Sequence, residues 1–500
     1  MSKWMNRPES LLAAGALGLA ATVAVLLYLS LASCESGSRS GWSPLGDSGR
    51  GGAGVVGGLM DPAVAPDRGP IVAIPPEHFG PKGPDLRVRI RTAVEKIVLG
   101  GSAEAMFWPG APGGERNPLV SAGEVEITLE GGAGGRFALR SPEGVAYAEA
   151  ATGVWASAAA RPGAGGVIAV EGVDHPGRLT LVPRPDVSSS AFDVIEFVAL
   201  EDYLPGVVQK EMLAGWPLGA FQVQAVCART YALHERSLSL RRGEKFDLEN
   251  SDRDQVYSGA SRNQTVLEAV RSTRGMVLTD GENGEVLRAY FSSTCGGRTA
   301  SAKDTWPTKP GYEYNLAAPI QARPRESCCE KSPLFRWTVA RDRDELARRI
   351  RAFGERQNLL VRKLKSLHSI EPMTFNEDGR PNKYKVIEPG GTWYALSGEE
   401  IRLACNNSVP AAAPVIGGVG AAPDGAAGLP ALPLVDRKAR VHSSDFTVRS
   451  TRDGMVFSGR GFGHGVGMCQ YCAKGFADRG EDWRSNVLRF YPGATLKQLY

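Results

Sequence analysis

The sequence predicts an α+β protein, in which a β-rich region precedes a central helical segment and the chain then returns to strands. The first indication is a strict alternation at 85–91, where Leu86, Val88 and Ile90 are apolar and arginines stand between them. This period of two is typical of a strand with one face in water. The second indication is the helical spacing of apolar residues after Asp202. The third is the content of 61 glycines and 33 prolines in 500 residues, which favours a turn-rich architecture.

Further short alternating runs continue the β-rich region, and Gly, Pro and Asp clusters separate them. Pro217 suits the start of a helix, because the N–H group that proline lacks would have no helical partner there. We expect strands at 124–129, 166–170, 178–182 and 194–200, and helices from 202 to about 212, from Pro217 onward, at 342–363 and at 482–490.

The N-terminus has the pattern of an export signal. Lys3 and Arg7 precede an apolar run at 11–32, which leads into Ser33 and Cys34. This pattern resembles a lipobox, in which the cysteine becomes the lipidated first residue of the mature protein. An uncleaved transmembrane anchor is the alternative. Both interpretations place the remaining chain in the bacterial cell envelope, exported and tethered to the membrane, where disulfides persist.

Composition divides the chain into three parts. Residues 1–34 are the signal peptide with its lipobox or the anchor, 35–84 form a Gly/Pro-rich tether, and 85–500 form one domain. Within this domain we expect a peripheral α/β segment at about 335–405 and a low-complexity insert at about 409–434. Hydrophobic residues make up 42% and charged residues 22%, which excludes a wholly disordered protein. The net charge of +4 is too small to indicate a nucleic-acid partner.

The densest pattern lies at 200–233, and Glu211 stands within it. We expect Glu211 at the end of the first helix, beside the N-terminus of the second. A carboxylate in such a place can serve in acid–base chemistry, although a glutamate is more often a solvated surface or capping residue.

Two other patterns could contribute to a site. Glycine recurs at every second position from Gly459 to Gly467, so an extended segment here would expose a bare backbone face, with His464 on the other face. A tightly packed strand with a buried, satisfied histidine is the alternative. At 289–299 a strand leads into Gly296 and Gly297, and Ser293 lies beside this turn as a polar lining residue.

Taken together, these patterns resemble the SpoIID family, the stage II sporulation protein D type of lytic transglycosylase that is related to the LytB amidase enhancers. The resemblance covers about 85–500 and rests on 201–204, 207–212, 217–233, 255–257, 289–299, 459–473 and 490–493. It implies cleavage of peptidoglycan glycan strands between N-acetylmuramic acid and N-acetylglucosamine. Its zinc cluster, which precedes the Gln255–Tyr257 segment in some members, has no Cys or His counterpart here.

The resemblance also implies roles for individual residues. The catalytic glutamate falls on Glu211, which would act as single general acid and base with no cofactor. The substrate would be glycan strands, denuded of stem peptides, and a cell-wall amidase is a further possible partner. A close cation would favour ionised Glu211, so Arg229 is assigned to substrate or backbone contacts instead. The other expected substrate-binding residues are Gln255, Tyr257, Ser293, Gly296, Gly297, His464 and Gln470.

The cysteines admit several interpretations. Cys469 and Cys472 form a C-x-x-C pattern, which can be a disulfide, a redox pair or part of a metal site. We favour disulfides in an exported protein, with a structural metal or buried thiols as alternatives and no catalytic metal. The disulfide candidates are Cys227, Cys295, Cys328, Cys329, Cys469 and Cys472, with Cys227 as a partner for one of the last two.

Three functions compete with the transglycosylase. The first is a glycan-binding protein that activates an amidase without cleaving glycan. The second is a zinc peptidase or amidase built on His464, Cys469 and Cys472, which lacks an H-E-x-x-H motif. The third is a hydrolase that uses Glu211 with Glu201 or Asp202, and it requires two carboxylates within about 5–9.5 Å of each other.

Overall fold

The computed structural model describes residues 79–100, 105–109, 119–121, 123–130, 136–141, 143–144, 146–150, 154–158, 166–251, 254–409, 431–452 and 454–500. The predicted signal segment, Cys34, most of the tether and most of the insert at 409–434 lie outside these residues. Two compact units divide the chain: the first ends at Gly275 and also includes Gln498–Tyr500, and the second is Met276–Lys497. Among the described residues no helix is both long and apolar enough to cross a membrane.

The first unit is built on two sheets. Their strand orders are β13-β1-β12-β11-β8-β3-β4 and β10-β9-β2-β5-β6-β7. The strands are β1 (Asp85–Val94), β2 (Lys96–Leu99), β3 (Ala105–Pro109), β4 (Leu119–Ser121), β5 (Val125–Glu130), β6 (Arg136–Arg140), β7 (Ala146–Ala150), β8 (Val154–Ala158), β9 (Ile168–Val170), β10 (Val173–His175), β11 (Arg178–Pro183), β12 (Phe192–Ala199) and β13 (Leu248–Glu249). The strands predicted at 85–91, 124–129, 166–170, 178–182 and 194–200 are thus present, with ends shifted by a few residues.

The polar face of β1 differs from its prediction. Leu86, Val88 and Ile90 are buried as expected. The arginines between them are not simply solvated, because Arg87 Nη2 lies 2.6 Å from Oδ1 of Asp247 and Arg89 Nη1 lies 3.3 Å from Oδ2 of Asp193. These carboxylates are buried, so the charged face of the strand is closed by ion pairs with distant segments.

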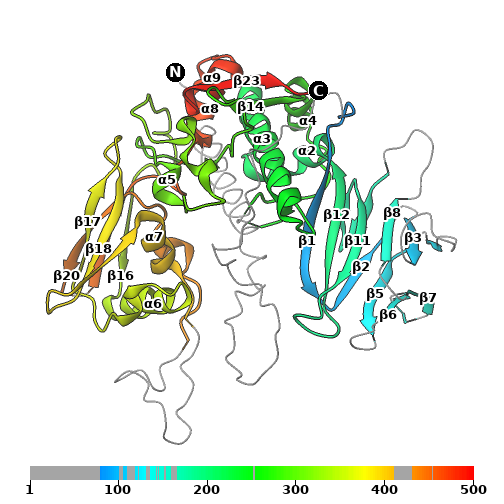
Figure 1. Ribbon diagram of the computed structural model, residues 1–500, viewed down its shortest axis with the longest axis horizontal. Coiled ribbons are helices and arrows are strands. Elements are labelled where there is room, and N and C mark those ends of the chain that lie inside the picture. Colours follow the sequence, from blue (N-terminus) through cyan, green and yellow to red (C-terminus); the bar gives the residue numbers. More distant parts are fainter. Residues whose placement is uncertain are drawn as a thin grey trace, which may run out of the picture. The chain divides into compact units, whose positions relative to one another are not determined.

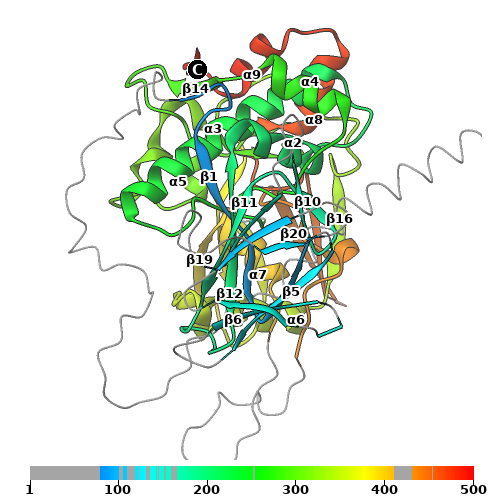
Figure 2. The same cartoon turned by 90° about the vertical axis from the view of Figure 1, so that its right-hand side faces the viewer.

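The helices of the first unit follow directly from its sheet. β12 leads without a loop into α2 (Leu200–Glu211), and α3 (Leu218–Arg242) and α4 (Gln264–Ser272) follow. In Figure 1 and Figure 2, α2 and α4 lie together at one end of β11 and β12. The two helices predicted from 202 and from Pro217 are confirmed, and Pro217 is the N-cap of α3.

The second unit contains smaller sheets and several helices. Its sheets are β14-β23, β15-β22, β16-β21-β20 and β17-β18-β19. The strands are β14 (Met276–Asp280), β15 (Phe291–Ser292), β16 (Trp337–Arg341), β17 (Ser369–Phe375), β18 (Pro381–Ile387), β19 (Trp393–Ser397), β20 (Phe446–Thr451), β21 (Gly454–Gly459), β22 (Met468–Cys469) and β23 (Ala494–Gln498). The helices are α5 (Ala302–Thr305), α6 (Arg343–Arg356), α7 (Gly398–Asn406), α8 (Gln470–Asp478) and α9 (Trp483–Phe490), with 3-10 turns η4 (Glu313–Leu316), η5 (Ala318–Ile320), η6 (Leu360–Lys363) and η7 (Arg437–Ala439).

The segment at 335–405 takes part in a substantial core. Ile350 of α6, Tyr384 of β18 and Ile401 of α7 pack with Phe446 and Phe457 from the strands that follow the insert. Figure 1 shows α6 and α7 beside these strands. This segment therefore shares one hydrophobic core with β20 and β21. The helix predicted at 342–363 ends at Arg356, and η6 follows it after a short loop.

Candidate functional site

Glu211 is the last residue of α2, as the sequence predicted. The apolar face of this helix buries Leu204, Val207 and Val208, which fixes its orientation in the first unit. Met212 caps the helix end and is 5% exposed. Glu211 itself is half-buried. The glutamate is thus held on a rigid helix end, with apolar cover on its C-terminal side.

The surroundings of Glu211 include a buried phenol. Burial, followed by the charges of Asp254, Glu211 and Glu196, holds the pKa of Tyr203 well above its usual range. The Tyr203 hydroxyl donates to Oε1 of Gln255 at 3.2 Å and remains protonated. The charge of Glu211 therefore acts on Tyr203, a buried phenol of the same helix.

Arg229 requires a correction. It is fully buried, and its Nε and Nη2 donate to the two carboxylate oxygens of Glu201 at 2.8 and 2.9 Å. Tyr500 Oη also donates to Glu201, at 2.6 Å. The predicted backbone contact exists, since Nη2 also donates to the carbonyl of Val270. With no exposed surface for a glycan, Arg229 joins α3 to α2 and α4 instead of binding substrate.

Gln255 and Tyr257 are also internal residues. Gln255 is 1% exposed, and besides accepting from Tyr203 it donates to the carbonyl of Ala228 at 3.2 Å. Tyr257 is buried against Tyr203, with ring centroids 4.7 Å apart. These contacts use both side chains to brace α2 and α3, so the structure gives them a positioning role in place of the predicted substrate contact.

The glycine-rich segment does not form the extended strand that was considered. β21 ends at Gly459, and Gly461, Gly463, Gly465 and Gly467 have φ angles of 79°, 97°, 79° and 68°. This left-handed region favours glycine. A Cβ atom at Gly467 would lie 2.1 Å from the Tyr290 carbonyl oxygen. The glycines thus allow the chain to pack tightly against its own backbone. The tight packing agrees with the alternative given from the sequence, but the segment is not a strand.

His464 belongs to this packed segment. Its Nε2 donates to the carbonyl of Phe291 at 2.9 Å, and its Nδ1 accepts from the N–H of Val466 at 3.0 Å. Burial lowers the pKa of His464 to about 4, so the ring is neutral near pH 7. Both ring nitrogens are occupied by backbone groups, which favours a structural role for the ring and argues against a metal ligand. The glycan contact of His464 stays a prediction.

The remaining predicted residues of the second unit lie near one another. β15 and β22 pair in parallel, with Ser292 opposite Cys469. The carbonyl of Ser293 accepts from the N–H of Tyr471 at 3.1 Å, next to buried Gln470 at the start of α8. Gly296 and Gly297 both have left-handed φ angles and turn the chain after Cys295. The structure therefore brings Ser293, Gly296, Gly297, His464 and Gln470 into the second unit, whereas Glu211 is in the first.

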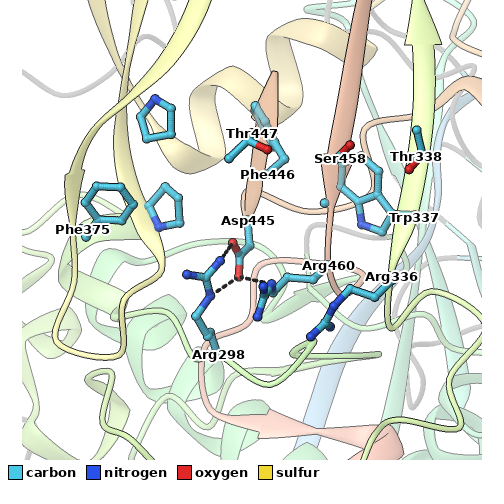
Figure 3. Close-up of a pocket in the computed structure, with 13 residues that line it drawn as sticks. Arg298, Arg336, Trp337, Thr338, Phe375, Asp445, Phe446, Thr447, Ser458 and Arg460 are labelled. Atoms are coloured by element: carbon cyan, nitrogen blue, oxygen red, sulfur yellow. Dashed lines mark hydrogen bonds and ion pairs between the residues drawn. The ribbon is translucent and has the colours of Figure 1, made fainter. Parts of the chain in front are cut away.

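A pocket of about 540 Å³, lined by both apolar and charged side chains, lies beside this turn. Arg298 binds Asp445 through two contacts of 3.0 and 2.5 Å, and Arg460 lies 3.8 Å from the same carboxylate (Figure 3). Arg336 also lines the pocket, so its lining includes three arginines and one carboxylate. The sequence patterns did not single out these arginines. The position of Arg460 inside the glycine-rich segment was the available signal.

The cysteines are not joined as predicted. Within the described part of the chain, no disulfide joins the predicted cysteines to one another. Cys227 lies on α3 in the first unit and Cys469 and Cys472 lie in the second. Cys295, Cys329, Cys469 and Cys472 instead bring their sulfur atoms together, without His464.

Comparison with known proteins supports the resemblance drawn from the sequence. The profile of SpoIID, described as Stage II sporulation protein, matches residues 188–279, which include α2, α3 and Glu211. An uncharacterized protein of Brachyspira hyodysenteriae is 28% identical over 325 residues, which cover 64% of this chain and 72% of that protein. The Amidase enhancer of Bacillus subtilis is 27% identical over 316 residues, covering 59% of this chain and 40% of the enhancer.

The Stage II sporulation protein D of Bacillus subtilis is 25% identical over 328 residues, covering 62% of this chain and 78% of that protein. The predicted relationship to the SpoIID family is therefore confirmed, and so is the mixed α+β fold.

Proposed function

We propose that this chain is a peptidoglycan lytic transglycosylase and that Glu211 is its single general acid and base. The family match and the relatives named for sporulation and for amidase enhancement support a cell-wall-related role. The observation that carries the proposal is the position of Glu211: a half-buried carboxylate at a rigid helix end, within the matched segment and beside buried Met212.

The reaction needs one carboxyl group that cycles a proton. Protonated Glu211 would donate its proton to the glycosidic oxygen as the bond from the muramic C1 to this oxygen breaks. The carboxylate would then accept the proton of the muramic 6-hydroxyl while that oxygen forms its bond to C1. The proton returns to Glu211 and no water is consumed. The product carries a 1,6-anhydro end.

The neighbouring carboxylates favour this mechanism over hydrolysis. Glu201 and Glu211 are ten residues apart in α2. At the helical rise, ~15 Å separates them along the axis, beyond the roughly 5–9.5 Å that paired glycosidase carboxylates need. Glu201 is held by Arg229 and Tyr500, and Asp202 binds Lys82 at 2.8 Å. The two carboxylates that the sequence offered as partners are thus distant and already engaged.

The arginine-lined pocket of the second unit supplies a plausible substrate contact. Arg298, Arg336 and Arg460 outnumber Asp445 there. N-acetylmuramic acid keeps its lactyl carboxylate after the stem peptide is removed, and arginine binds carboxylates well. We therefore assign recognition of this acidic group to the pocket, in place of Arg229 and His464.

The main alternative is an activator of a cell-wall amidase that does not cleave glycan, which the likeness to an amidase enhancer supports. The deciding experiment incubates the purified full chain with denuded glycan strands and, separately, with intact peptidoglycan and a cell-wall amidase. The proposal predicts that the chain alone releases soluble glycan fragments. If it releases none and yet accelerates the amidase, the activator function is correct.

The proposed location is the cell envelope, to which the family match gives general support. Anchoring through lipidated Cys34 or an uncleaved N-terminal helix stays a prediction, because both lie outside the described residues. Labelling with a lipid precursor distinguishes the two, since Cys34→Ala would remove the label only from a lipoprotein.

A further inference from the structure

Four buried cysteines of the second unit converge although they come from three separate segments. Cys295 follows β15, Cys329 lies in the loop after η5, and Cys469 and Cys472 stand at the start of α8. Their exposed fractions are 2%, 0%, 1% and 1%. Their four sulfur atoms all lie within 4.8 Å of one another. Thiols hydrogen-bond only weakly, so four of them gain little from one another in a core. Their convergence from distant segments therefore calls for another explanation.

The distances fit a single tetrahedral ion. Cys295 Sγ lies 3.6 Å from Cys329 Sγ and 3.7 Å from Cys472 Sγ. Four thiolates around one zinc ion, with Zn–S bonds of about 2.3 Å, have sulfur atoms ~3.8 Å apart. Disulfide sulfurs are separated by only about 2.05 Å. An iron–sulfur cluster holds its cysteines much farther apart because its own irons and sulfides lie between them. The cluster therefore has room for one ion.

Backbone donors surround the sulfurs as they would surround thiolates. The N–H of Cys295 donates to Cys469 Sγ at 3.2 Å, and the N–H of Cys472 donates to the same sulfur at 3.4 Å. The N–H of Cys328 donates to Cys472 Sγ at 3.3 Å. Hydrogen bonds of this kind to ligand atoms orient metal ligands and stabilise their charge. The N-terminus of α8 adds a partial positive charge at the C-x-x-C pair.

A fixed cation also lies beside the cluster. Arg325 donates to the carbonyl of Gly467 at 2.7 Å and to that of Phe490 at 3.0 Å, and it acts electrostatically on Cys295. Four thiolates with one Zn²⁺ carry a net charge of −2, so this guanidinium and the three backbone donors reduce the cost of burying that charge.

We propose that Cys295, Cys329, Cys469 and Cys472 bind one Zn²⁺ ion as a closed structural site. All four positions are taken by protein ligands, so the site has no open position for a substrate or a catalytic water. The ion would tie the turn after β15, the loop after η5 and the start of α8 together. It replaces the expectation of disulfides and is independent of the proposed glycan chemistry.

Cys328 provides a matched control for the test. It is the sequence neighbour of Cys329, but its own side chain is not among the four ligands, and its contribution to Cys472 comes from the backbone. The full chain, its Cys329→Ser variant and its Cys328→Ser variant would be purified without added metal and analysed for metals by mass spectrometry. We expect one zinc per chain in the wild type and in Cys328→Ser, and almost none in Cys329→Ser.

A second measurement covers the case in which Cys329→Ser fails to fold. An organomercurial thiol reagent titrated into the wild type should release one zinc per chain once the four cluster thiols are modified. Zinc-free wild type with a disulfide within the cluster in non-reducing peptide maps would overturn the proposal. Iron in place of zinc would overturn the identity of the ion, and equal zinc in the two serine variants would overturn the ligand assignment.

Discussion

The helix pair around Glu211 and the glycine-rich segment around His464 are both dense in sequence motifs, but they are built in different ways. In the first unit, side chains carry the structure: Arg229, Glu201 and Gln255 form buried polar bonds that hold α2 and α3 together. In the second unit, the backbone carries it, since glycines in left-handed conformations let the chain approach itself. Dense motifs in both regions thus mark positions where close packing restricts which residues the fold accepts.

The largest expected effect tests which residue of the helix pair performs chemistry. Glu211→Gln keeps the size and polarity of the side chain but cannot cycle a proton, so glycan release should fall by at least about 100-fold. The partly exposed Glu268 of α4, which pairs with Arg271 on the same helix, is changed to Gln as the matched control and should leave release unchanged. Initial rates on denuded strands measure both. Near-wild-type activity in Glu211→Gln would remove this residue from the mechanism.

The next effect separates a structural arginine from a binding one. Arg229→Met should destabilise the first unit by about 3–5 kcal/mol, because it leaves the buried Glu201 without its cation. Lys82→Met breaks the exposed pair with Asp202 and should cost at most about 1 kcal/mol. Urea unfolding measures the two changes. If Arg229→Met unfolds like wild type and only weakens glycan binding, the substrate role first predicted for Arg229 is correct.

Histidine protonation tests whether His464 is a sealed structural residue. Its pKa of about 4 in the folded chain compares with about 6.5 when unfolded. Below pH 6.5 the unfolded chain therefore binds a proton at His464, whereas the folded chain does not until the pH approaches 4. The free energy of unfolding falls over this range of pH. This loss should reach about 3 kcal/mol at most. Burial also lowers the pKa of His442 to about 4, so His442 adds to the same trend.

Urea unfolding at several pH values measures this dependence. His464→Gln should flatten the pH dependence by one proton relative to wild type, while the contribution of His442 persists. An unchanged slope would mean that His464 titrates alike in both states and is therefore open to solvent.

A smaller effect tests the role of the glycines. Gly467→Ala and Gly480→Ala both place a side chain on a left-handed residue, which costs roughly 1–2 kcal/mol. Only Gly467 would bring its Cβ close to another atom, the Tyr290 carbonyl oxygen, because Gly480 has nothing within 4 Å. Thermal unfolding should show a larger loss for Gly467→Ala. Equal losses would indicate that conformation alone, and not close packing, selects glycine there.

Local patterns explain what could be predicted from the sequence. The apolar period of β1, the helix start at Pro217 and the helix end at Glu211 depend on residues adjacent in the chain, and all three were predicted. The helix α7 was missed although its capping box, Ser397 with Glu400, was a readable signal. The helix α8 was missed because it begins directly after the glycine-rich segment, with Cys469 as its N-cap.

Long-range pairing explains most of what could not be predicted. Arg87 meets Asp247 across 160 positions of sequence, and Arg298 meets Asp445 across 147. Which arginine neutralises a buried carboxylate is decided by sheet register and loop packing, and neither leaves a local pattern. The same holds for the four cysteines, whose spacing showed one C-x-x-C pair but not its two distant partners.

The ends of the glycan products test the central claim most directly. The purified full chain is incubated with denuded glycan strands, and the released fragments are identified by mass spectrometry. One acid–base residue with no water in the reaction predicts 1,6-anhydro-muramic ends, lighter by one water than ordinary reducing ends. Reducing ends in the wild-type product would contradict the account, because they require an activated water and a second carboxylate beside Glu211.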